Sequence, residues 1–175
     1  MGRARAAAGS LVFLVAAPGV VAGVGPWLLT GWQAREPPYW LPVRVAGWAL
    51  LAAGAAVLLH AFARFADEGV GTPAPVAPTE RLVVGGLYRH VRNPMYLAVT
   101  ATIVGQALVL GRPVLLAYAA VFGAVVAAFV HGYEEPTLRR RYGAQYEEYC
   151  RAVPRWWPYG LRRWPRWRPG STTRS

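Results

Sequence analysis

The stretch PVLLAYAAVFGAVVAAFVH, at residues 113–131, decides the fold because it is apolar until its last residue. A helix needs about 20 apolar residues to cross roughly 30 Å of hydrocarbon, at about 1.5 Å per residue. A helix that spans a bilayer also satisfies its own backbone hydrogen bonds. The stretch therefore predicts a transmembrane helix.

Three more windows of this kind precede it along the chain. Residues 10–32 carry no charge, residues 45–63 are interrupted only by His60, and residues 94–111 only by Gln106 and threonines. For both interrupting side chains we expect hydrogen bonds between helices. The sequence thus predicts an all-α integral membrane protein with about four transmembrane helices and a C-terminal amphipathic cytoplasmic helix.

The first window has an alternative interpretation and a packing signal. Arg3 and Arg5 precede it, as in a signal peptide, but the apolar run exceeds the usual signal core of about 7–15 residues. Gly19 and Gly23 form a GxxxG pair, and residues 49–56 are rich in alanine. These small residues predict close packing between helices.

Composition excludes several classes of protein. The 175 residues suit one domain, and 55% of them are hydrophobic but only 15% charged, so neither a disordered chain nor an ordinary soluble domain is expected. Cys150 is the lone cysteine, which excludes an internal disulfide and a cysteine-based zinc site, and no metal site is expected. All 19 basic residues are arginine, a bias that indicates a GC-rich, bacterial source.

The arginines also predict the orientation in the cell membrane. With both termini in the cytoplasm, 16 of the 19 arginines lie inside, as the positive-inside rule requires. Arginine and tryptophan alternate over residues 155–168, a pattern that anchors a chain to anionic headgroups or binds nucleic acid. Because this tail directly follows membrane helices, we expect membrane lipids as partners and no nucleic acid.

The chain divides into four regions by these criteria. They are a cytoplasmic N-terminus at 1–9, the first two transmembrane helices at 10–66, a cytoplasmic loop with two more spans and a tail helix at 67–158, and a basic tail at 159–175, partly disordered. Within the third region, Pro73 and Pro75 predict a rigid loop that covers a site or lines its entry. Pro136 predicts a kink or a fresh helix start. One apolar face of the tail helix recurs at helical spacing: Leu138, Tyr142, Tyr146, Tyr149 and Val153.

Two motifs at the ends of the last two spans carry a family resemblance. The segment GLYRHVRNPMYL at residues 86–97 resembles the signature G-x-Y-x-x-x-R-H/N-P-x-Y of integral-membrane methyltransferases, the isoprenylcysteine carboxyl methyltransferase and phospholipid methyltransferase group. Glu134-Glu135 with the tyrosines downstream resembles its second signature, and Arg155 and Pro158 resemble its closing R-x-x-P. The resemblance covers residues 69–158, and no GxGxxG dinucleotide motif is present in the chain.

The resemblance implies an S-adenosylmethionine-dependent methyltransferase that moves a methyl group to a lipophilic acceptor at the cytoplasmic face. Arg92 is then expected to bind the cofactor carboxylate, and Glu135 or Glu134 its ammonium. Tyr88 or Tyr96 would face the sulfonium. Three further site residues are expected. Asn93 would be a neutral hydrogen-bond donor to the cofactor, at a position where histidine is commoner, and Pro94 also suits the first turn of a helix. Arg155 would orient an acidic acceptor or anchor a lipid headgroup.

The reaction itself leaves alternatives open. A carboxylate acceptor needs only positioning and desolvation, whereas an amine or a thiol needs a base, for which Glu135 and His131 are candidates. We expect Glu135 and Arg155 to be the catalytic residues. The competing interpretations are an NADPH-dependent enzyme similar to sterol reductases and a non-catalytic, lipid-binding membrane scaffold. No protein partner is predicted.

Overall fold

The structure, a computed structural model, describes residues 16–35, 41–68, 82 and 84–157, and all regular secondary structure in this part of the chain is helical. Two helices are long and apolar enough to span a membrane, at Leu41–Ala61 and Pro113–Tyr142. The apolar helices Ala16–Thr30 and Pro94–Leu110 are shorter. An all-helical protein with membrane-spanning character is therefore confirmed, and the number of four spans stays a prediction.

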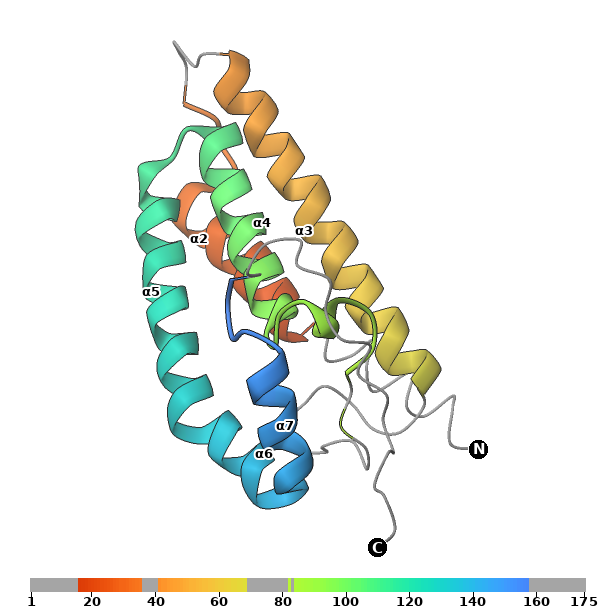
Figure 1. The fold of residues 1–175 in the computed structure, drawn as a ribbon. Coiled ribbons are helices and arrows are strands. Elements are labelled where there is room, and N and C mark those ends of the chain that lie inside the picture. The colour runs from red at the N-terminus through yellow and green to blue at the C-terminus, as the bar shows by residue number, and fades with distance from the viewer. Residues whose placement is uncertain (1–15, 36–40, 69–81, 83, 158–175) are drawn as a thin grey trace, which may run out of the picture.

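The apolar helices lie side by side as a bundle (Figure 1). They are α2 (Gly25–Thr30), α3 (Leu41–Glu68), α4 (Pro94–Leu110) and α5 (Pro113–Phe129). Ile103 of α4 and Leu115 of α5 are fully buried at the centre of the core. Val121 and Val125 of α5 are more than half exposed, which suits a helix with one face in lipid rather than in water.

The glycines that allow two helices to pack closely lie in α3 and α4 and are not those of the predicted GxxxG pair. A Cβ atom on Gly54 of α3 would lie 2.8 Å from the carbonyl oxygen of Ala98, and one on Gly105 of α4 would lie 2.8 Å from that of Gly47. Side chains at these positions would separate α3 from α4, the most extensive helix pair. Gly23 has nothing within 4 Å of its Cβ position, so the prediction that it packs closely is wrong.

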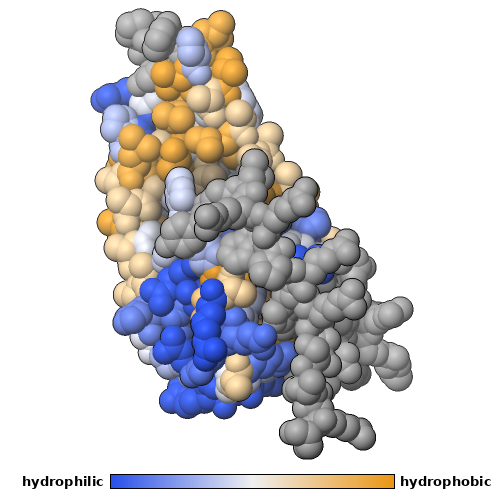
Figure 2. Space-filling model, in the orientation of Figure 1, coloured by the Kyte–Doolittle hydropathy of each residue, from blue (hydrophilic) through white to orange (hydrophobic). Residues whose placement is uncertain are grey.

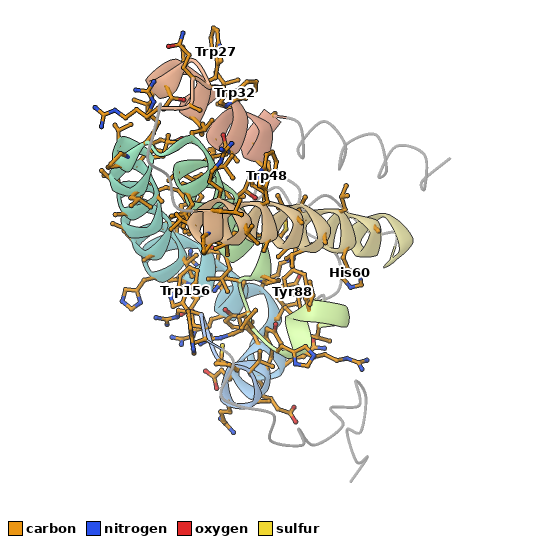
Figure 3. The ribbon with its side chains drawn as sticks, turned by 90° about the horizontal axis from the view of Figure 1, so that it is seen from above. Trp27, Trp32, Trp48, His60, Tyr88 and Trp156 are labelled. Atoms are coloured by element: carbon orange, nitrogen blue, oxygen red, sulfur yellow. The ribbon has the colours of Figure 1, made fainter. Side chains whose placement is uncertain are left out.

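The first helix contains a π-helical turn, η1 (Val20–Val24), and two polar side chains of the bundle satisfy it. Gln106 Nε2 donates to the carbonyl oxygen of Ala22 at 2.6 Å, and the Tyr118 hydroxyl donates to that of Val21 at 2.9 Å. A π turn shifts the backbone hydrogen-bond register, so outside donors are useful there. The expected hydrogen bond from Gln106 between helices is confirmed, whereas His60 is exposed (Figure 3).

The predicted tail helix is two helices. After α5 the chain passes through a second π turn, η3 (Val130–Glu134), into α6 (Glu135–Tyr142), and Pro136 lies in the first turn of α6. Gly143, at a φ of 51°, separates α6 from α7 (Ala144–Ala152). This positive φ favours glycine and turns α7 back along α6, which helical spacing alone did not predict.

The predicted apolar face nevertheless forms one cluster. Tyr146, Tyr149 and Val153 are buried, and Leu138 and Tyr142 of α6 pack against them. The predicted regions 1–9 and 159–175 and the proline-rich loop around Pro73 lie outside the described residues. Helix α3 runs two residues past the predicted boundary at 66.

Candidate functional site

A buried carboxylate with two arginines is the centre of the polar region below the apolar bundle. Glu135 is 4% exposed. Arg92 Nη1 donates to its Oε1 at 2.9 Å. Arg155 Nε donates to Oε1 at 2.8 Å, and Arg155 Nη2 donates to Oε2 at 2.6 Å. Both oxygens are therefore engaged, one of them by two guanidinium groups.

Two adjacent glutamates at the end of the π turn η3 and the start of α6 have different partners, because neighbouring helical residues point in different directions. A π-helical turn adds a residue to the ordinary helical register, and such turns are frequent at functional sites. Glu135 meets the two arginines, while Glu134 accepts a hydrogen bond from the Tyr96 hydroxyl at 3.0 Å. The site therefore contains two acid-centred groups side by side in sequence, each joined to the start of α4.

The first motif and the end of α7 are joined by backbone as well as side chains. The backbone N–H of Arg92 donates to the carbonyl oxygen of Pro154 at 2.9 Å, and Asn93 Nδ2 donates to that of Arg155 at 3.2 Å. The Tyr149 hydroxyl donates at 2.7 Å to the carbonyl oxygen of Tyr88, in the short helix η2 (Gly86–Arg89). These bonds hold two segments, distant in sequence, beside the carboxylate of Glu135.

The electrostatics of the cluster favour an anion. Two guanidinium groups on one carboxylate leave one positive charge in excess, and the Arg92 side chain is only 12% exposed. Among the described residues no acceptor reaches the buried Nε of Arg92. The hydrogen bonds to Glu135 raise the pKa of Arg155 above its ordinary value. Because a buried donor without a partner costs about 1–3 kcal/mol, the orphaned Nε is itself a reason to expect an anionic ligand.

An open pocket of about 430 Å³ adjoins this cluster. Its volume falls within the range of roughly 300–1,000 Å³ that small-molecule sites occupy. Figure 2 shows the hydrophilic surface of this end of the molecule, directly below the apolar surface of the bundle. The residues that line the pocket are Arg92, Arg139, Glu147, Cys150 and Arg151.

The structure brings four of the predicted site residues together: Arg92, Asn93, Glu135 and Arg155. Tyr96 and Glu134 form the neighbouring pair, and the buried Pro94 opens α4. Tyr88 contributes its backbone carbonyl to the site, on the side away from Trp27 and Trp32, as Figure 3 shows.

Sequence reasoning missed several residues of this region. Cys150, which the sequence analysis used only to exclude a disulfide and a zinc site, lies with its Sγ 2.8 Å from Arg92 Nη1. Tyr149, assigned only to an apolar face, also donates the hydrogen bond to Tyr88. The pocket is also lined by three charged residues for which no role was predicted: Arg139, Glu147 and Arg151. Cys150 and Arg151 lie three and four residues after Glu147 in α7, and this spacing could have indicated that they share one face of the helix with it.

The fold and the cluster define a helical membrane protein with a polar site at one end of its bundle. The chain belongs to the phospholipid methyltransferase family, whose family model matches residues 43–145. This match contains Arg92, Asn93, Glu134 and Glu135, whereas Arg155 lies beyond it. Comparison with curated proteins and with solved structures gave no match. The family resemblance drawn from the two motifs is thereby confirmed, and the chain has the character of a membrane methyltransferase.

Proposed function

We propose that the protein uses S-adenosylmethionine to methylate a lipophilic acceptor that carries an anionic group, at the cytoplasmic face of the membrane. The observation that carries the proposal is the cluster of Arg92, Arg155 and Glu135 beside an open pocket at the polar end of an apolar bundle. Membership of the phospholipid methyltransferase family supports the reaction type.

The residues present fit the amino-acid end of this cofactor. The unpartnered Nε of Arg92 suits a carboxylate, because a guanidinium binds a planar anion in a forked geometry. Glu135 uses both oxygens on arginines, so its role is to hold those arginines in place. Glu147, which lines the pocket and is mostly exposed, is the acid best placed to meet an ammonium. When bound, the cofactor supplies a methyl group activated by its positively charged sulfur.

The charge of the pocket indicates the class of acceptor. Three arginines and one glutamate line it. The cofactor has one carboxylate, one ammonium and one sulfonium, and so adds a further positive charge. A carboxylate or phosphate on the acceptor would balance this excess, and a lipophilic body would lie along the apolar bundle. Arg139 and Arg151 are the side chains expected to bind that anion.

Methyl transfer to an ionised acceptor requires little acid–base catalysis from the protein. An ionised carboxylate is already a nucleophile, so the chain needs only to bind it, align it and exclude water. Glu134 is held by Tyr96, and that contact fixes the Tyr96 ring beside the cluster. For an amine or thiol acceptor, Glu134 would be the base, because Glu135 is fully paired.

The test is calorimetric titration of the detergent-purified protein with S-adenosylhomocysteine, with NADPH titrated in parallel. We expect saturable binding of S-adenosylhomocysteine alone. Arg92→Lys should weaken it by roughly tenfold or more, because a point charge does not reproduce a forked contact. Arg140→Gln, an exposed charge change outside the pocket, is the matched control and should bind as wild type. No binding by folded protein, or binding of NADPH instead, would contradict the proposal.

A further inference from the structure

The segment 153–156, called the tail strap below, completes the charged cluster from the far end of the chain. It leaves α7 and runs across the start of α4, where Arg92 and Asn93 each donate one hydrogen bond to its carbonyl oxygens. Arg155 projects from this strap to Glu135. The backbone bonds thus hold the very residue whose side chain closes the site.

Asn93 differs from the other residues of the first motif in what it contacts. It is 7% exposed, and its Nδ2 donates to the carbonyl oxygen of Arg155 rather than pointing into the pocket, whose lining does not include it. The sequence had suggested that Asn93 donates to the cofactor. In the structure that donor is already used, and it is used on the backbone of the strap.

We propose that Asn93 is a positioning residue that acts through Arg155: its amide anchors the tail strap so that the Arg155 guanidinium reaches Glu135. Only the consequence for cofactor binding rests on the proposed function. The anchoring of the strap is a separate, directly measurable claim.

Charge and conformational entropy give the physical reason. The Arg155 side chain is 35% exposed, so water competes for its guanidinium, and ordering a long arginine side chain costs conformational entropy. The strap is held at the two carbonyl oxygens that flank the Cα atom of Arg155, so the position from which this side chain extends is fixed. Loss of the Asn93 anchor leaves one backbone bond, and the guanidinium then samples positions away from Glu135. Arg92 would be left as the remaining partner of the carboxylate.

The experiment compares Asn93→Ala with Asn93→His. Alanine removes the donor, whereas histidine retains a ring N–H donor and stands at this position in the signature that the sequence resembles. Gln145→Ala, an exposed amide in α7, is the matched control. The two readouts, on detergent-purified full-length protein, are hydrogen exchange of a peptide that contains Arg92, whose backbone N–H donates to the strap at Pro154, and the affinity for S-adenosylhomocysteine.

We expect the backbone amide of Arg92 to exchange roughly threefold to tenfold faster in Asn93→Ala, because the strap carbonyl that accepts its hydrogen bond is then held less firmly. The affinity should fall by a similar factor, and Asn93→His should restore both to within about twofold. Should Asn93→Ala not fold, Asn93→Ser, whose donor is too short to replace the amide, takes its place with the same expectation.

Unchanged exchange in Asn93→Ala would overturn the proposal. So would equal losses in the alanine and histidine variants, because packing and not the donor would then matter. A wild-type protein that binds no S-adenosylhomocysteine would contradict the proposed function, while the exchange comparison would still decide whether Asn93 anchors the strap.

Discussion

At the scale of single residues, the site depends on one buried carboxylate that pairs with two arginines. Glu135 is 4% exposed, and the Arg92 side chain that it binds is 12% exposed. Breaking a buried ion pair from one side costs more than the pair contributes, because the other charge stays buried and unpaired. Glu135 is therefore a residue whose loss affects both stability and ligand binding.

Replacing Glu135 with Gln should destabilise the fold by about 3 kcal/mol, the lower end of the usual range, because Arg155 is partly solvated. The same variant should lose measurable binding of S-adenosylhomocysteine. Thermal unfolding in detergent gives the first quantity and calorimetry the second. Glu148→Gln, an exposed acid on α7, is the control. Equal melting temperatures for the two variants would contradict the prediction that the ion pairs of Glu135 stabilise the fold.

Tyr149 offers a test of how α7 is held. Its hydroxyl donates to the carbonyl oxygen of Tyr88, and burial raises the pKa of this phenol above its ordinary value of about 10. A raised pKa in the folded state means that its contribution to stability is complete below pH 10 and is lost as the pH rises further. Tyr149→Phe should cost about 1 kcal/mol at pH 8.

The measurement for this prediction is unfolding of wild type and Tyr149→Phe from pH 7 to pH 11. The difference between them should be constant up to about pH 9 and then shrink, because the exposed phenol of the unfolded wild type ionises while the buried phenol of the folded protein stays protonated. A difference that grows with pH would contradict the assignment of this bond.

At the scale of elements, close contact between α3 and α4 supports the site from above. The first motif leads directly into α4, so the position of Arg92 and Asn93 depends on where α4 lies. Gly54 and Gly105 allow the two backbones to approach. The contact is a matter of backbone distance, because nothing larger than hydrogen fits at these positions.

Gly54→Ala should destabilise the protein by about 1–3 kcal/mol, since the added methyl group would overlap the backbone of α4. Gly123→Ala on α5 is the matched control, because nothing lies within 4 Å of its Cβ position. That control should be neutral or stabilising by up to about 1 kcal/mol, from helix propensity. Thermal unfolding in one detergent compares the two, and similar effects would contradict the packing of α3 on α4.

At the scale of the whole molecule, the surface has two parts: an apolar body, which suits lipid, and a hydrophilic end, which suits water (Figure 2). Helices α6 and α7 and the charged cluster lie at one end, and the loop that joins α4 to α5 lies at the other (Figure 1). The distribution of arginines predicts that the end with the cluster faces the cytoplasm.

Thiol labelling tests this orientation. A cysteine at exposed Gln145, in α7, should react with a membrane-impermeant maleimide only after cells are permeabilised. A cysteine at Gln33, at the opposite end, should react in intact cells. The wild type, with its half-buried Cys150, measures the background. The reverse pattern would place the site on the outer face.

Much of this protein was predictable from local patterns. Long apolar runs predict helices in a membrane environment, because the backbone N–H and C=O groups in a bilayer must form hydrogen bonds with one another. The two motifs were sufficient for the family and for the arginines and acids that meet at Glu135. The tyrosines of the tail were also predicted to share one apolar face, and in the structure they lie in one cluster.

What only the tertiary structure decided is which of these groups contact one another. Helical spacing does not show that Gly143 turns α7 back, that Asn93 uses its donor on the strap, or that both oxygens of Glu135 are occupied by arginines. Nor could it distinguish Gly23, which contacts nothing, from Gly54, which contacts the backbone of α4. The physical reason is that periodicity reports the face of a helix that is apolar, whereas hydrogen bonds and close approach depend on distances between segments far apart in the chain.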